Sequence, residues 1–218
     1  KRKDYQFCSD RCTNLAAKKA PQLMRVLKGH VFYENVKKMF VKQWNDQRQH
    51  LPTIMKIYLI TWTAYQHTSF EKYCRKVARM RKIGKGKLKE LCSMSNCRLC
   101  PTIRTAFKSS LEYKHQMVMN NATTGIRFGG GLYMSPSSNR AIKYALNLLE
   151  GSEYLTVLVT RTVLGKMQFL KDEQHHRLSP DKGYDSVKAC TKGGPLEYVT
   201  YRKDAVHPAY LLMINKHM

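Results

Sequence analysis

The sequence predicts an α+β fold, and three observations support this class. Apolar residues recur at helical spacing before residue 80, whereas β-branched, aromatic and aliphatic residues concentrate in short runs after residue 155. A run of three glycines at 129–131 lies between these two regions. The chain has 218 residues, enough for one domain with an appendage and a proper core.

The first 90 residues are expected to form a basic, mostly helical region. A first helical stretch is interrupted by Pro21, and a second helix is predicted over 36–49. Pro52 suits the first turn of a third helix that contains Ile54 and Ile57. The apolar residues that define the first stretch are Ala16, Ala17, Leu23, Val26 and Leu27.

Strands are expected in the second half of the chain. They are predicted over 155–162, 166–170, 197–201 and 210–214.

The glycine-rich turn is the most informative segment. Glycine lacks Cβ, so this turn would let a ligand approach the backbone amides closely. Tyr133 follows at a predicted strand position, and Ser137 offers a capping oxygen for a helix that carries Tyr144 in its first turns. Two tyrosines presented in this way can flank a flat ring, which suggests a nucleotide or nicotinamide pocket.

The charge is strongly positive. Thirty-nine Lys and Arg residues stand against fifteen Asp and Glu residues, for a formal net charge of +24. Such a field attracts polyanions, so RNA and DNA are expected contacts, although no DNA-reading motif is visible. The chain has no apolar run of membrane-spanning length and no signal peptide. We therefore expect a nuclear or cytoplasmic protein with no membrane partner.

Three motifs occur in a fixed order: R-F-G-G-G-L-Y at 127–133, G-Y-D-S-V at 183–187, and L-E-Y-V-T-Y at 196–201, with P-A-Y-L-L at the end. This order resembles the poly(ADP-ribose) polymerase catalytic domain, among the ADP-ribosyltransferases with a His-Tyr-Glu signature. The resemblance covers roughly 101–216. The N-terminal half resembles a fungal branch of that family with a C-S-x-x-C run and a cysteine cluster before an I-R-T-A-F helix.

The resemblance implies two packed, mostly antiparallel sheets, with a catalytic domain over 91–218 and a basic helical region over 1–90. It also implies transfer of ADP-ribose from NAD, as substrate, to a protein or nucleic-acid acceptor. Tyr133 and Tyr144 match the stacking pair around nicotinamide, and Glu197 matches the catalytic glutamate. The same pocket would be lined by Gly131, Ser135, Arg140 and Ala141. The family often has serine where Ala141 stands, and alanine lacks the hydroxyl that helps to hold the nicotinamide amide in that family.

The family's His-Gly motif is not recognisable. Ile83-Gly84 would occupy its position and keep the backbone contact of Gly84, or the motif's residues are missing between Gly84 and Leu91, or the protein is a catalytically inactive relative. The inactive alternative is a basic module that binds nucleic acid or ADP-ribose. An enzyme similar to tRNA 2′-phosphotransferases is not favoured, because its phosphate-gripping residues cannot be placed here.

The seven cysteines suggest structural zinc rather than a disulfide framework. Two groups carry metal-like spacing: Cys8 and Cys12, and Cys92, Cys97 and Cys100. Either the two groups share one ion, or Cys8 and Cys12 pair with an upstream Cys-x-x-Cys that this sequence does not contain. One of the eight histidines is a further candidate ligand. Reduced, metal-free cysteines are the alternative.

Overall fold

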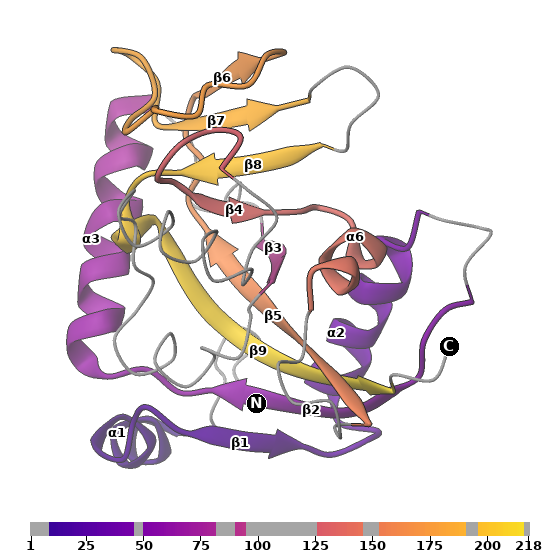
Figure 1. The fold of residues 1–218 in the computed structure, drawn as a ribbon. Coiled ribbons are helices and arrows are strands. Elements are labelled where there is room, and N and C mark those ends of the chain that lie inside the picture. Colours follow the sequence, from indigo (N-terminus) through magenta and orange to yellow (C-terminus); the bar gives the residue numbers. More distant parts are fainter. Residues whose placement is uncertain are drawn as a thin grey trace.

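The computed structural model describes residues 9–45, 50–81, 90–94, 126–145, 153–190 and 196–215, with the backbone alone for residues 10, 81 and 90–94. These residues form a mixed α+β structure with two sheets in which most strand pairs are antiparallel (Figure 1). The predicted fold class is confirmed at this level.

The helices are α1 (Asp10–Lys18), α2 (Val31–Lys42), α3 (Ala64–Arg81) and α6 (Ser138–Lys143), with a short 3₁₀ turn η1 (Lys203–Ala205). The strands are β1 (Leu23–Val26), β2 (Ile54–Ile60), β3 (Glu90–Met94), β4 (Leu132–Met134), β5 (Tyr154–Thr162), β6 (Met167–Leu170), β7 (Ser186–Ala189), β8 (Glu197–Thr200) and β9 (Val206–Asn215).

The larger sheet has the order β1-β2-β9-β5-β3, and all its pairs are antiparallel. One face is covered by α2 and α6, where Phe40 and Ile142 pack against Ile57, Val157 and Leu212. Neighbouring strand residues such as Leu158 and Leu211 belong to a separate apolar cluster, as expected from the two-residue period of a strand. Because β1 and β2 lie in this sheet, it crosses the boundary expected at residue 90.

The smaller sheet has the order β4-β8-β7-β6, in which only β6 and β7 run parallel. It lies above the larger sheet in Figure 1. Leu132, Met134 and Tyr198 of this sheet pack with Leu164 and Val206, which follow β5 and begin β9. This apolar cluster joins the two sheets.

The strands predicted over 155–162, 166–170, 197–201 and 210–214 are confirmed as β5, β6, β8 and β9. The third predicted helix is wrong, because Ile54 and Ile57 lie in strand β2, which pairs with β9. The spacing of a short apolar run fits either element, and β-branched and aromatic residues favour the strand.

The first predicted helical stretch is partly wrong for a related reason. It ends at Lys18, and the segment from Leu23 to Val26 pairs with β2 as an edge strand. Proline removes a backbone donor and cannot continue a helix, so Pro21 separates the two elements. The second helix begins at Val31 and ends at Lys42, earlier than predicted.

No helix among the described residues has the length and apolar character needed to cross a bilayer.

His207 is buried in the contact between α3 and β9. Its ring stacks on Trp62 and meets the edge of Phe70, and its Nδ1 lies 3.1 Å from the carbonyl oxygen of Pro208. Burial lowers the pKa of His207 to about 2, and the charges of His67 and Arg161 act in the same direction. The protein therefore keeps this ring neutral at any moderate pH.

We predict that this residue makes the folded state sensitive to acid. An unfolded histidine titrates near pH 6.5. Below that pH the unfolded chain therefore binds a proton at His207 that the folded chain does not bind. The free energy of unfolding should then fall by up to about 1.4 kcal/mol per pH unit as pH decreases from ~6.5. Urea unfolding of wild type and His207→Phe between pH 7 and pH 5 measures this slope. His207→Phe should lose that part of the slope, whereas the exposed control His176→Gln should keep it; equal slopes in all three proteins would contradict the assignment.

Candidate functional site

Two glycines of the glycine-rich turn are required by contacts within the protein. Gly129 has a φ of 69°, and a Cβ there would lie 1.8 Å from the carbonyl oxygen of Arg177. The Gly130 amide donates to that same oxygen at 3.0 Å. A Cβ on Gly131 would lie 2.2 Å from Cγ1 of Val199 in β8. The sequence analysis assigned this freedom to a ligand, but the close packing of the turn already accounts for Gly129 and Gly131.

Tyr133 and Glu197 share one face of the smaller sheet. Tyr133 in β4 stands opposite Val199 in β8, and Glu197 precedes Val199 by two residues, so all three side chains project to the same side. Glu197 in turn stands opposite Ala189 of β7. The register thus brings together two residues that are 64 positions apart in the sequence (197 − 133).

The hydroxyl of Tyr133 ties its ring to the glycine-rich turn. It accepts from the Phe128 amide at 2.8 Å and donates to the Gly129 carbonyl at 2.9 Å. Burial raises the pKa of Tyr133, and the nearby Tyr201 and Glu197 add to this effect. Burial also raises the pKa of Tyr201 to about 12, and its hydroxyl donates to the Phe128 carbonyl at 2.7 Å. Two tyrosines therefore fix Phe128 and the backbone around it.

Glu197 is buried, with 7% of its surface exposed, and pairs with Arg127 at 2.7 Å between Oε2 and Nη2. Among residues whose side chains are described, it is the only Asp or Glu that is buried. Burial acts to lower the pKa of Arg127, but the attraction of Glu197 outweighs it, so the pKa is raised. The guanidinium of Arg127 therefore stays protonated beside the buried carboxylate.

Arg127 also connects Glu197 with the rest of the predicted site. The electrostatic neighbours of its guanidinium include Tyr144 and Glu173 as well as Glu197. Arg127 precedes Phe128 in the first motif, but the sequence analysis gave it no role. Glu197 could have pointed to this role, because a carboxylate in an apolar strand requires a cationic partner.

Tyr144 lies at the end of α6 rather than in its first turns, because the helix begins at Ser138 and Tyr144 is its C-terminal cap. Ser137 is the N-terminal cap, but its side chain makes no capping hydrogen bond. Arg140 lies one turn before Tyr144, with its guanidinium carbon 4.6 Å from the centre of the tyrosine ring, and it donates to the tyrosine hydroxyl. Arg140 therefore orients the Tyr144 ring.

The remaining predicted pocket residues differ in their surroundings. Ser135 is buried, and its hydroxyl accepts from the Ser137 amide at 3.1 Å. Ala141 is fully buried in the apolar cluster between α6 and the larger sheet, so it does not line an open surface. Gly84 lies outside the described residues.

The predicted zinc ligands are mostly beyond what the structure describes. Cys8, Cys97 and Cys100 fall outside the described residues. Cys12 lies in α1, and the backbone of Cys92 lies in β3, opposite Val159 of β5. No group of three or more His, Cys, Asp or Glu side chains suited to a metal occurs within the described ranges. Structural zinc therefore stays a prediction.

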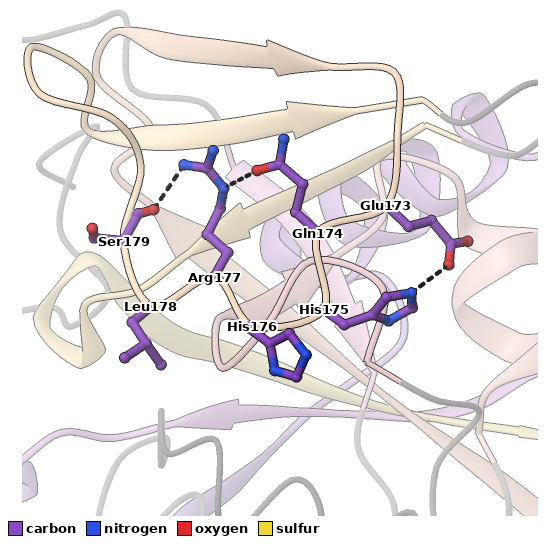
Figure 2. A pocket seen from close by; sticks show the side chains of 7 residues that line it. All are labelled: Glu173, Gln174, His175, His176, Arg177, Leu178 and Ser179. Atoms are coloured by element: carbon purple, nitrogen blue, oxygen red, sulfur yellow. Dashed lines mark hydrogen bonds and ion pairs between the residues drawn. The ribbon is translucent and has the colours of Figure 1, made fainter.

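A loop after β6 forms an open depression of about 520 Å³ beside this site (Figure 2). Its lining residues are Glu173, Gln174, His175, His176, Arg177, Leu178 and Ser179. The Gln174 amide donates to the Arg127 carbonyl at 2.7 Å, and His175 contacts the Ile126 carbonyl through Nδ1. The loop therefore supports the backbone on both sides of Arg127.

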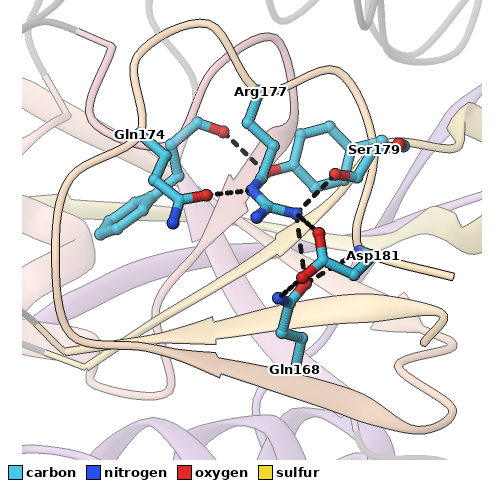
Figure 3. A network of polar contacts seen from close by, with 7 residues as sticks. Gln168, Gln174, Arg177, Ser179 and Asp181 are labelled. Atoms are coloured by element: carbon cyan, nitrogen blue, oxygen red, sulfur yellow. Dashed lines mark hydrogen bonds and ion pairs between the residues drawn. The ribbon is translucent and has the colours of Figure 1, made fainter. Parts of the chain in front are cut away.

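Arg177 holds this loop in shape (Figure 3). Its guanidinium donates to Gln174 Oε1 at 2.6 Å, to the Ser179 carbonyl at 2.9 Å and to Asp181 Oδ1 at 3.0 Å. Gln168 at the edge of the smaller sheet joins the network by accepting from Arg177 at 3.2 Å and from the Asp181 amide at 2.9 Å. The chain of contacts thus runs from β6 through Arg177 to the glycine-rich turn.

No protein-family model matches this chain, and no curated protein matches it. The functional interpretation therefore depends on the geometry of the described residues and on the resemblance of the three motifs.

We predict strong energetic coupling between Arg127 and Glu197. Removing one partner leaves the other charge buried without compensation, whereas removing both does not. A double-mutant cycle with Arg127→Gln and Glu197→Gln, measured by urea unfolding, should give a coupling free energy of about 1–3 kcal/mol.

The control for this cycle is the pair of Arg202 and Asp204, which lie 2.7 Å apart with the arginine side chain 53% exposed. Exposed pairs contribute little, so its coupling should stay below ~1 kcal/mol. Coupling of the Arg127 pair no larger than that of the control would show that the buried pair does not stabilise the site.

Proposed function

We propose that the protein transfers ADP-ribose from NAD to a protein or nucleic-acid acceptor. The observation that carries this proposal is the position of Glu197, the only buried carboxylate among the described side chains. It shares a sheet face with Tyr133 and pairs with Arg127, whose electrostatic neighbours include Tyr144. The resemblance to ADP-ribosyltransferases implies one acid and two phenol rings around the nicotinamide and its ribose, and these contacts support that arrangement.

The chemistry explains why these residue types would be needed. The bond between nicotinamide and ribose breaks, its electron pair leaves with nicotinamide, and the acceptor's nucleophile bonds to the same ribose carbon and loses a proton. Positive charge develops on the ribose ring, as in glycoside cleavage. The proposed role of Glu197 is to hold the ribose hydroxyl and to stabilise this charge. Tyr133 and Tyr144 would hold the nicotinamide ring between them.

Arg127 has a specific place in this proposal. Its guanidinium forms an ion pair with the Glu197 carboxylate, with 2.7 Å between Nη2 and Oε2. NAD carries a pyrophosphate, and a guanidinium binds phosphate oxygens in a bidentate way. We propose that the substrate draws Arg127 toward its phosphates, so that Glu197 becomes available to the ribose as NAD binds. The side chain of Arg127 is 24% exposed, so it is accessible from solvent.

The direct test measures nicotinamide released from NAD. Glu197→Gln should reduce the rate about a hundredfold, because a preorganised charged group is lost while the shape is kept. Glu153→Gln is the matched control, since Glu153 is exposed and directly precedes β5, and it should leave the rate unchanged. Thermal unfolding of both variants separates loss of catalysis from loss of fold.

The outcome also decides between the two functions that the sequence left open. If the wild-type protein releases no nicotinamide with any acceptor, the transferase proposal is wrong. Binding of ADP-ribose without turnover would then indicate the non-catalytic basic module.

A further inference from the structure

Helix α3 has two opposite faces of different character. Phe70, Tyr73, Cys74 and Val77 are buried, and they pack with Val163 and Ala205. Lys72, Arg75, Lys76 and Arg79 are exposed. Since successive residues turn by about 100° around a helix, these two sets of four lie on opposite sides of it.

The four exposed residues form a single basic cluster, here called the α3 basic face. Within the described part of the chain, none of them pairs with a carboxylate side chain. Arg75 donates to the backbone carbonyl of Glu71, which is the only acidic residue of α3. The nearby Asp204 already pairs with Arg202 at 2.7 Å.

Four like charges on one face are unfavourable for a helix whose exposed side contacts only water. Lys72 and Arg75, Lys72 and Lys76, Arg75 and Arg79, and Lys76 and Arg79 are all three or four residues apart, where like charges repel and destabilise the helix. A solvated helix face usually mixes both signs. A polyanion would relieve this repulsion along the whole cluster.

An exposed aromatic ring extends the same face. Tyr65 is 79% exposed and lies two turns before Lys72, on the same side of the helix. At 1.5 Å per residue, the face from Tyr65 to Arg79 is about 21 Å long. Basic side chains that follow a phosphate backbone, together with an aromatic ring on which a base can stack, are the features that bind single-stranded nucleic acid.

We propose that the α3 basic face, with Tyr65, binds single-stranded nucleic acid. A membrane is a poorer fit, because an amphipathic helix enters a bilayer with its apolar side, and that side of α3 is packed in the protein core. The proposal is independent of NAD chemistry and stands whether or not the protein is a transferase.

The test uses the whole chain and a fluorescently labelled single-stranded RNA of about 20 nucleotides, longer than common site sizes of ~4–16. Binding is followed by fluorescence anisotropy at a series of salt concentrations. The variant replaces Lys72, Arg75, Lys76 and Arg79 with Gln. The control replaces Lys18, Lys19, Lys37 and Lys38 with Gln, which removes the same charge from exposed positions at the C-terminal end of α1 and in α2.

We expect the α3 variant to bind more weakly and to lose about 3 units from the slope of log affinity against log salt, since each phosphate contact contributes ~0.7. The control should lose less than about 1 unit of this slope. Tyr65→Ala should weaken binding roughly tenfold with an unchanged slope, because stacking is not a charge contact. Cooperative thermal unfolding at a temperature no lower than that of wild type would show that the exposed substitutions leave the fold intact.

Three results would overturn the proposal. Equal slopes in the α3 variant and the control would mean that the positive charge of the whole protein binds RNA, with no preference for the α3 basic face. Equal affinity of Tyr65→Ala and wild type for single strands would remove the stacking contact. Phosphatidylserine vesicles that compete fully with the RNA and bind Tyr65→Ala as well as wild type would indicate a general anionic surface instead.

Discussion

The ion pair between Arg127 and Glu197 is the contact on which the arrangement of the site depends. A carboxylate with 7% exposure is tolerated in a sheet only if a cation compensates it, and here that cation comes from the loop before β4. The loop can deliver Arg127 only because its backbone is fixed on both sides. Tyr133 holds Phe128 and Gly129 from one side, and the carbonyl of Arg177 binds Gly130 from the other. Glycine at 129 and 131 is the steric condition for both contacts. The glycines are thus needed for the backbone contacts that position Arg127 against Glu197. A ligand would approach a turn that is already closely packed.

Much of the fold could be predicted from local patterns, and the errors have a common cause. Strands β5, β8 and β9 are rich in β-branched and aromatic residues, so their propensity and their environment agree. The segment from Ile54 to Ile60 carries a pattern that also fits a helix, and only its pairing with β9, more than 150 residues later, decides for a strand. The segment from Leu23 to Val26 depends on β2 in the same way. The local sequence does not show which distant strand such a segment pairs with.

The site, like the fold, has residues that motifs identify and contacts that depend on strand pairing. Tyr133 and Glu197 were identified from motifs, and the register of β4 and β8 supplies what the sequence could not, namely that both side chains project to one face. The role of Arg127 was missed although the residue belongs to a quoted motif, because an ion pair across a sheet is invisible without the pairing. The support from the loop at 173–179 was equally out of reach, since several of its contacts with the glycine-rich turn involve backbone atoms, which no residue pattern encodes. Ala141 illustrates the converse error, a position near the pocket in sequence whose side chain belongs to the core.

The two sides of helix α3 separate its packing in the core from the nucleic-acid binding that we propose for it. Its apolar side is packed with Val163 and Ala205, and the Arg202 guanidinium lies 4.9 Å from the ring centre of Tyr73. Arg202 and Ala205 belong to the short segment that follows β8, the strand of Glu197. A nucleic acid on the opposite side of α3 would therefore contact a helix whose position is already set by the core. Binding there requires no rearrangement of β8, because the basic side chains reach outward from a fixed backbone. The two surfaces are consequently separable, and a change in one leaves the geometry of the other in place.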